Sequence, residues 1–217
     1  MNKSQKKAVW IAEKVIKGLV VTPGLKEMDV ARAIRVKLKQ YGTRPAFRTI
    51  VASGRRAALP HGFATNKIIR RGELVVIDFG ALYNGYCSDI TRTVVVGKPT
   101  ARQKRIYRVV KRAKLRAIRK VKVGVACCEV DRAPRGFIAG RGFGEYFIHT
   151  TGHGIGRKIH EAPKISKGNK HKLKAGMVIT IEPGIYIKGW GGVRLEDMVV
   201  VTSRGCEILT RAPGFLK

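Results

Sequence analysis

The sequence predicts an α+β fold in which antiparallel β-hairpins are covered by amphipathic helices. Residues 74–96 and 177–202 each contain two runs of β-branched residues around a glycine-containing turn, which is the pattern of a β-hairpin. Four other stretches repeat apolar residues with the 3.6-residue period of a helix. With 217 residues, the chain is long enough to bury a real core, and one compact domain is expected.

The first two helical stretches open the chain. We predict a helix from Ser4 to about Leu19, which Pro23 stops, and a second helix over residues 27–40, which ends at Gly42. A short strand is expected over residues 47–53. These elements supply packing for a central sheet, and nothing in them suggests chemistry.

The first hairpin is predicted to turn at Asn84-Gly85, because Asn-Gly between β-branched runs is the strongest short-range hairpin signal. A two-residue turn at this point makes Asp78 and Asp89 diagonal neighbours on one face of the hairpin. Such neighbours lie about 7 to 8 Å apart at the backbone. Their carboxylates can therefore converge on a metal ion between them.

A long helix is predicted over residues 100–121, starting with a capping box formed by Thr100 and Gln103. One face of this helix is apolar. The other face carries a run of cations with no acid four residues further on, namely Arg105, Arg108, Lys111, Arg112, Arg116, Arg119 and Lys120. This face is either a polyanion-binding ridge or a solvated surface. A fourth helix is expected over residues 128–140.

The second hairpin repeats the design of the first. An apolar run leads into Glu182, the tip lies near residues 189–192, and the returning strand carries Arg194 and Glu196. A loop centred on Gly189 puts Glu182 directly across from Glu196. Each acid taken singly could be a solvated surface group. Four acids beside buried-strand patterns instead call for a positive partner, and a pair of divalent metal ions is the natural one.

Several motifs resemble the prolidase and aminopeptidase P family of the pita-bread metallopeptidases. They are Asp78 with Asp89 eleven residues later, His149-Thr-Thr-Gly-His153-Gly-Ile-Gly followed by His160-Glu161, Glu182-Pro183-Gly184, and Gly192-Val-Arg194-Leu-Glu196-Asp197. The resemblance runs from about residue 9 to residue 211. It implies a pita-bread fold with a pseudo-two-fold curved antiparallel sheet and helices packed outside. It also implies one catalytic domain over residues 1–217, without the amino-terminal domain of full-length prolidases.

The same resemblance implies a site with two divalent metal ions. The ligands would be Asp78 on one ion, His153 and Glu182 on the other, and Asp89 and Glu196 bridging both. One imidazole among carboxylates is an oxygen-rich set that suits Mn or Co best, with Fe or Zn as alternatives.

The activity that the resemblance implies is hydrolysis of Xaa-Pro peptide bonds, as an aminopeptidase or dipeptidase, by a hydroxide between the two ions. Glu182 would carry the proton from water to the leaving nitrogen. His61, seventeen residues before Asp78, and His160 would bind or polarise the substrate. Arg194 would steer a substrate carboxylate or hold Glu196. Three positions depart from the family pattern, namely Arg56, Thr150 and Arg157.

The charge balance leaves other functions open. The chain has 45 Lys and Arg against 14 Asp and Glu, a net charge of +31 that attracts polyanions. No RNA-binding motif accompanies this charge. This charge would fit a nucleic-acid or ribosome-binding module with weak catalysis, which is one alternative to an Xaa-Pro peptidase. The family resemblance leaves methionine aminopeptidase activity as a second alternative. Besides peptide substrates, a homodimer is a further candidate partner.

The lengths of apolar runs and the spacing of the cysteines predict membrane contact and cellular compartment. No run approaches 18 consecutive apolar residues, so no membrane contact is expected. The four cysteines, at positions 87, 127, 128 and 206, have no C-x-x-C spacing and are expected to be reduced. A cytoplasmic protein is the prediction.

Overall fold

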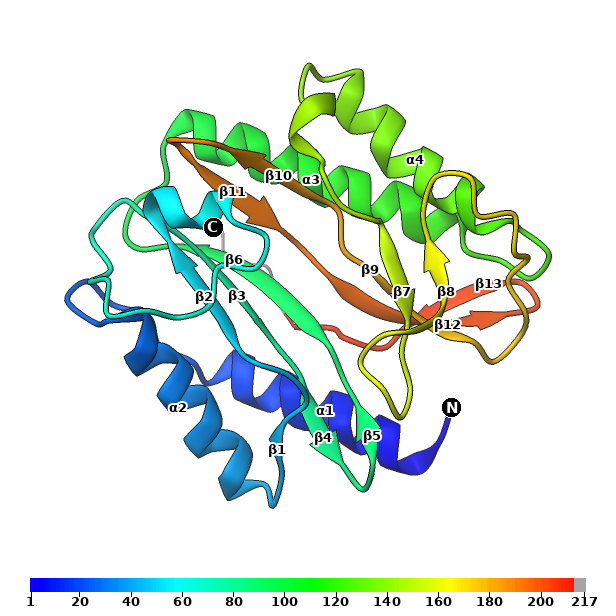
Figure 1. Ribbon diagram of the computed structural model, residues 1–217, viewed down its shortest axis with the longest axis horizontal. Helices are drawn as coiled ribbons and strands as arrows, with labels where there is room; N and C mark the ends of the chain where they lie inside the picture. Colours follow the sequence, from blue (N-terminus) through cyan, green and yellow to red (C-terminus); the bar gives the residue numbers. More distant parts are fainter. Residues whose placement is uncertain (213–217) are drawn as a thin grey trace.

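The computed structural model describes residues 1–212 and arranges them as antiparallel sheets with two pairs of helices outside (Figure 1). The α-helices are α1 Lys3–Lys17, α2 Glu27–Gln40, α3 Ala101–Lys120 and α4 Cys127–Ala139, and two short 3-10 helices cover Gly54–Ala58 and Gly144–Tyr146. The strands are β1 Arg44–Pro45, β2 Ile50–Ser53, β3 Leu74–Phe79, β4 Ala81–Tyr83, β5 Tyr86–Cys87, β6 Ile90–Val95, β7 Gly152–Gly154, β8 Glu161–Ile165, β9 Val178–Ile181, β10 Gly184–Ile187, β11 Gly191–Arg194, β12 Asp197–Thr202 and β13 Gly205–Ile208.

The predicted helices all occur, with small differences at their ends. Helix α2 has the predicted bounds, whereas α1 ends at Lys17 because Gly18 already caps it. The capping box of α3 is present, since the Gln103 amide donates to Thr100 Oγ1 at 3.2 Å and the Thr100 amide donates to Gln103 Oε1 at 2.8 Å. The predicted strand over residues 47–53 is too long. Strand β2 begins only at Ile50, because Phe47 and Arg48 leave the sheet and line a cavity.

The first hairpin has the predicted register. Asp78 pairs with Thr91 in β3 and β6, and the same register continues into β4 and β5. Asn84 and Gly85 both have positive φ, at 45° and 77°, as a two-residue type I′ turn requires. The prediction that Asp78 and Asp89 are diagonal neighbours is therefore confirmed.

The second hairpin also has the predicted register. Strand β10 pairs Gly184 with Arg194 in β11, and β9 pairs Ile181 with Asp197 in β12. These two pairs belong to one continuous register, which places Glu182 across from Glu196. Strand β9 continues into a five-stranded sheet of order β13-β12-β9-β7-β8, and all described strand pairs are antiparallel.

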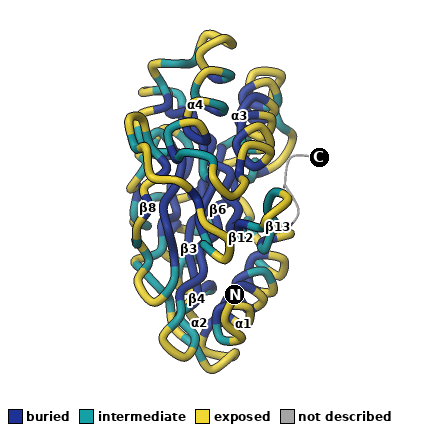
Figure 2. Tube along the Cα trace, turned by 90° about the vertical axis from the view of Figure 1, so that its right-hand side faces the viewer, coloured by how far each residue is buried: buried dark blue, intermediate teal, exposed yellow. Residues whose placement is uncertain are grey.

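Each hairpin packs against its own pair of helices. Helices α1 and α2 share an apolar core with β2 and β3, while α3 and α4 share one with β9 and β12. Most strand residues are buried, and the exposed residues of the helices lie on their outer sides (Figure 2). The predicted α+β arrangement is thus present, with the two hairpins side by side in the middle of the molecule (Figure 1).

Two simpler predictions concern membranes and cysteines. Within residues 1–212, none of the helices combines the length and apolar character that crossing a bilayer demands. All four cysteines are free thiols, as predicted.

Candidate metal centre

Two of the five predicted ligands lie within strands, and the other three lie where a hairpin strand is interrupted. Asp78 lies on β3, and His153 lies on β7. Asp89 lies between β5 and β6, Glu182 between β9 and β10, and Glu196 between β11 and β12. At these last three points the regular strand assignment is interrupted, so the side chains are free to turn towards one another across the two hairpins.

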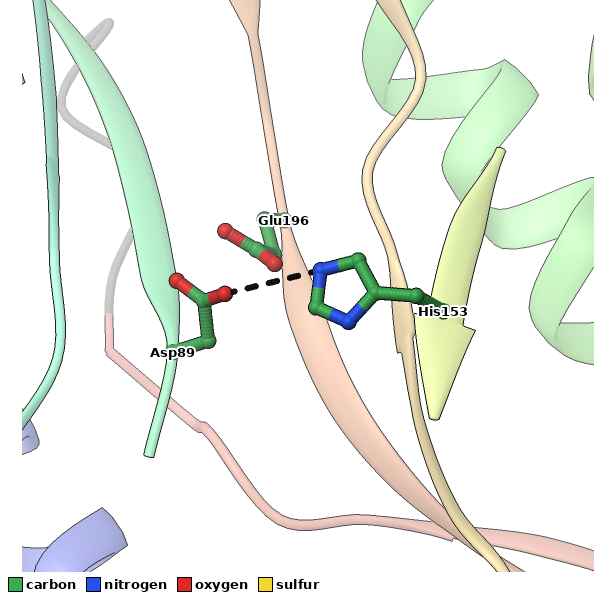
Figure 3. Close-up of side chains that lie close together, drawn as sticks. All are labelled: Asp89, His153 and Glu196. Carbon is green, nitrogen blue, oxygen red and sulfur yellow. Dashed lines mark ion pairs between the residues drawn. The ribbon is translucent and has the colours of Figure 1, made fainter. Parts of the chain in front are cut away.

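The structure brings an imidazole and several carboxylates together. His153 Nε2 lies 3.8 Å from Asp89 Oδ2 and 3.4 Å from Glu182 Oε1. One donor atom each from Asp89, His153 and Glu196 falls within 4.8 Å of the others (Figure 3). Strands from both hairpins and β7 thus aim their side chains at a common point, as a metal site requires.

Burial makes this cluster costly without a cation. Asp78, Asp89 and Glu196 are 8%, 5% and 1% exposed. One oxygen of each has no hydrogen-bond partner among the described residues, namely Asp78 Oδ1, Asp89 Oδ1 and Glu196 Oε1. A buried, unpaired carboxylate oxygen is strongly unfavourable. Divalent cations bound at this site would give these oxygens partners, so the residues present fit metal binding.

Burial and mutual repulsion raise the pKa values of the clustered carboxyl groups. Burial, together with the charge of Asp78, raises the pKa of Glu182 to about 8. Burial and neighbouring carboxylates also raise the pKa values of Asp89 and Glu196 well above their usual range. Like charges in a low-dielectric site favour the protonated form, and a bound cation would reverse that preference.

His153 is prepared to act as a ligand. Burial lowers its pKa to about 4, so the imidazole is neutral at physiological pH. Its Nδ1 lies 3.0 Å from the Gly154 carbonyl oxygen, which assigns the ring proton to Nδ1. The lone pair on Nε2 then faces the carboxylates, which is the tautomer that metal ligation uses.

Arg194 has a different partner from the one expected. Its Nη2 donates to Asp78 Oδ2 at 2.6 Å, whereas Glu196 Oε2 accepts from Thr91 Oγ1 at 2.7 Å. The guanidinium also donates to Thr91, to the carbonyl of Pro60 and to the hydroxyl of Tyr186. The expectation that Arg194 holds Glu196 is wrong, because Thr91 lies between them and accepts from one while donating to the other.

A cavity of about 880 Å³ is lined in part by the predicted ligands Asp78, Asp89, His153 and Glu182. His61 and His160, the two histidines expected to meet the substrate, both line it and are both exposed. The His160 ring lies edge-on to the His153 ring, with 4.4 Å between their centroids. Two cations, Arg48 and Lys164, also line the cavity. The structure therefore brings four of the five predicted ligands, all except Glu196, and both predicted substrate-contacting histidines to the lining of one cavity.

Residues 3–203 match metallopeptidase family M24. The chain belongs to this family. It is 51% identical over 208 residues to the Xaa-Pro dipeptidase of Pyrococcus furiosus, an alignment that takes in 94% of this chain and 60% of that protein. An Xaa-Pro dipeptidase structure from Bacillus anthracis superposes with a TM-score of 0.97 at 46% identity and covers 99% of this chain and 61% of its own. An X-Pro aminopeptidase structure from Thermotoga maritima superposes with a TM-score of 0.95 at 43% identity. The match covers 97% of this chain and 61% of that one.

These similarities confirm the pita-bread fold and the family resemblance of the M24 chain. The chain spans about three-fifths of the length of each of these relatives.

Two residues of the M24 site received no role from the sequence. The Tyr186 hydroxyl accepts from Arg194 Nη1 and lies 2.8 Å from His149 Nε2. His149 Nδ1 contacts the Thr150 carbonyl at 2.8 Å, so Nε2 is the acceptor and Tyr186 donates to it. Burial lowers the pKa of His149 to about 4 and raises that of Tyr186 to about 12, which keeps both neutral. His149 begins one of the quoted motifs and Tyr186 lies two residues after another, but only the fold shows that they meet.

Departures from the family pattern are partly explained by packing. Arg56 pairs with the buried carboxylate of Glu27 and donates to the Phe63 carbonyl at 3.0 Å. Glu27 also accepts from Ser53 and Thr65, so Arg56 completes a network that joins α2 to β2. Arg157 extends over the Tyr86 ring at 5.8 Å, while Thr150 lines the cavity.

Proposed function

We propose that this chain is a metal-dependent exopeptidase that hydrolyses Xaa-Pro bonds in small peptides. The observation that carries the proposal is the cluster of donor atoms from Asp89, Glu196 and a neutral His153, which lie within 4.8 Å of one another, while one buried oxygen of each carboxylate has no hydrogen-bond partner among the described residues. The relatives named above, an Xaa-Pro dipeptidase and an X-Pro aminopeptidase, supply the substrate class. Residues 1–217 act in this proposal as one catalytic unit.

We assign two divalent ions, with Mn or Co preferred, to the five ligands Asp78, Asp89, His153, Glu182 and Glu196. Bound ions supply a hydroxide from water near neutral pH and polarise the scissile carbonyl. The pairing of Arg194 with Asp78 supports two ions. With Oδ2 held by the guanidinium, Asp78 keeps Oδ1 without a partner among the described residues, and this oxygen would be available to hold a second cation.

Glu182 is the proton carrier in this proposal. Its carboxyl has a pKa of about 8 in the metal-free site and is held by Thr180 Oγ1 at 3.1 Å. It lines the cavity, so it can take a proton from water and pass it to the leaving nitrogen. A prolyl nitrogen bears no hydrogen in the peptide, which makes this proton delivery essential for release.

The cavity provides contacts for both ends of a short peptide. His61 and His160 stand at its mouth, where neutral or protonated imidazoles can hydrogen-bond the scissile carbonyl. Arg48 and Lys164 give the mouth a positive charge that suits a free carboxylate. Arg194 is only 2% exposed and acts by holding Asp78 and Tyr186 in place.

A peptide panel tests this function. The metal-depleted protein, reconstituted with Mn or Co, is incubated with Ala-Pro, Ala-Pro-Ala and Met-Ala-Ser, and the released amino acids are quantified. We expect cleavage of the two proline peptides, no cleavage of Met-Ala-Ser, and loss of activity with a chelator. Preferred release of methionine from Met-Ala-Ser would identify a methionine aminopeptidase instead, and no turnover of any peptide would contradict the enzyme.

Metal content gives a second readout. Elemental analysis of protein purified without chelator, together with calorimetric titration, is expected to give two divalent ions per chain. Asp78→Asn is expected to reduce this number to one while leaving the His153 side of the site loaded. Retention of two ions in this variant would contradict the proposed division of ligands. The free cysteines fit a reducing compartment, and we place the protein in the cytoplasm.

A further inference from the structure

Helix α3 carries a straight stripe of five arginines, which we call the arginine stripe: Arg105, Arg108, Arg112, Arg116 and Arg119. Steps of three, four, four and three residues keep all five within about 80° of one another around the helix axis, at 100° per residue. All five are exposed, and Figure 2 shows the outer side of α3 at the surface. At 1.5 Å per residue, the stripe is about 21 Å long.

Almost nothing on the described surface offsets this charge. The only ion pair that α3 makes within residues 1–212 is between Lys114 and Asp197, off the stripe. Helix α3 itself contains no acid. All fourteen acids of the chain lie in the described part, and only Glu129, Glu145 and Glu207 are exposed. Like charges three and four residues apart destabilise a helix, so helix stability does not explain the stripe.

The chemistry around the stripe favours a phosphate backbone as the partner. Arginine forms bidentate hydrogen bonds with phosphate, and a nucleic-acid duplex carries one charge per ~1.7 Å of its axis. The nearby rings are already covered by guanidinium groups, as with Arg102 over Trp190 at 5.0 Å and Arg116 over Phe137 at 4.5 Å. These rings are therefore not free to stack on the bases of a single strand.

An acidic membrane surface is a poorer match. Helices that lie in a bilayer interface insert a large apolar face. The apolar face of α3 is buried against β9, β10 and β11, and Leu115 is the only large apolar side chain of α3 that is exposed. We propose that the arginine stripe binds the phosphate backbone of duplex nucleic acid without reading its sequence.

The stripe and the metal centre are independent of each other. None of the residues lining the 880 Å³ cavity comes from α3. Helix α3 lies on the outer side of the second hairpin (Figure 1) and contributes no residue to the cavity lining, so we expect a bound duplex to leave the cavity open. The inference therefore does not rest on the proposed peptidase activity, and it predicts that peptide hydrolysis continues with nucleic acid bound.

The experiment measures binding to a fluorescently labelled 24-base-pair duplex by anisotropy across a series of KCl concentrations. The test variant is Arg105→Gln, Arg108→Gln, Arg112→Gln. Its matched control is Arg32→Gln, Arg35→Gln, Lys39→Gln on α2, which has the same spacing, exposed positions and charge change. Each phosphate contact contributes about −0.9 to the slope of log K against log salt. We expect the α3 triple to bind at least tenfold more weakly with a slope shallower by about 2 to 3, and the control to change less than twofold.

Duplex DNA, duplex RNA, single-stranded DNA and polyglutamate are compared as ligands. Both duplexes are expected to bind regardless of sequence, and better than the single strand. Equal losses in the two triple variants would show that only net charge matters and would overturn the proposal. So would polyglutamate binding as tightly as the duplex, or absence of duplex binding at low salt. Peptide hydrolysis and the melting temperature of each triple are measured in parallel, so that unfolding cannot imitate a loss of binding.

Discussion

Buried carboxylates dominate the energetics of the site at the scale of single residues. Glu196 accepts a hydrogen bond from Thr91 through Oε2, while its Oε1 has no partner within the described structure. Its charge also opposes ionisation of Asp89. A residue that we propose as a metal ligand therefore destabilises the fold when no cation is bound.

Replacing Glu196 with glutamine separates these two effects. Glu196→Gln keeps the volume and the acceptor for Thr91 but removes a buried charge. We expect Xaa-Pro hydrolysis to fall at least 100-fold, while the metal-free protein melts a few degrees higher, since 1 kcal/mol is worth about 2–4 °C at this size. Thermal scans with and without Mn check this, with the exposed Glu207→Gln as control. If Glu196→Gln instead lowered the melting temperature of the metal-free protein, repulsion between the buried acids would not be what destabilises the fold.

The Tyr186 hydroxyl stabilises the site through two buried hydrogen bonds. Tyr186→Phe leaves His149 Nε2 without its donor and removes one acceptor from Arg194. The expected cost is about 1–3 kcal/mol, because buried polar groups lose their partners. Chemical denaturation measures it, and Tyr41→Phe at an exposed position is the control. If both variants unfold at the same denaturant concentration, the hydroxyl contributes nothing.

Close backbone approach sets the position of His153 at the scale of elements. Strand β7 lies between β8 and β9, and Gly152 passes so near β9 that an added Cβ would stand 1.9 Å from the Thr180 carbonyl oxygen. The Thr180 hydroxyl also accepts from the His153 amide at 3.0 Å. The distance between His153 and the carboxylates thus depends on the absence of a side chain next to it.

Gly152→Ala is expected to force β7 away from β9. We expect a loss of about 3 kcal/mol or more in stability, at the upper end of overpacking costs, and at least tenfold weaker metal binding. Denaturation and calorimetric metal titration measure the two effects. Gly136→Ala on α4 is the control, because its added Cβ meets nothing within 4 Å and alanine favours the helix by up to about 1 kcal/mol. If Gly152→Ala and Gly136→Ala had similar stability and metal affinity, close packing at Gly152 would not position His153.

Stability of the metal-free protein should depend on pH at the scale of the whole molecule. Glu182 has a folded-state pKa of about 8, above its ordinary 4.5, so its contribution is full at low pH and is lost as pH rises through 8. Asp89 and Glu196 shift in the same direction. His149 and His153, with pKa values lowered to about 4, contribute fully above 6.5 and lose their contribution as pH falls through 4.

Because the acids and the histidines stabilise the metal-free protein in opposite pH ranges, we expect its stability to fall steeply above neutral pH. As pH rises from 6.5 to 8, the two histidines lose their remaining protons in the unfolded state, so the acids dominate and the metal-free melting temperature falls. Saturating Mn is expected to abolish this fall, because the bound ions favour ionised ligands. Thermal scans from pH 5 to 8.5 test both statements, with Glu182→Gln expected to flatten the curve. A metal-free melting temperature that is constant across this range would contradict the raised pKa values of the buried acids.

Much of the architecture follows from local patterns in the sequence. The Asn84-Gly85 turn determines the register of the first hairpin, because both positions accept positive φ and strand pairing then alternates with a period of two. The 3.6-residue apolar period located α2 and α3, and Thr100 with Gln103 marked the start of α3. These signals act over a few residues, so no tertiary information is needed to read them.

The contacts of the site were decided only by tertiary structure. The sequence determined that five ligand types are present in order, and it placed Asp78 beside Asp89 and Glu182 across from Glu196. It did not determine that Arg194 pairs with Asp78, or that Tyr186 joins Arg194 to His149. Those contacts bridge different strands and loops, and their geometry depends on how the two hairpins kink and pack. Side-chain partners across such breaks are set by the packing of the whole core, which no local period encodes.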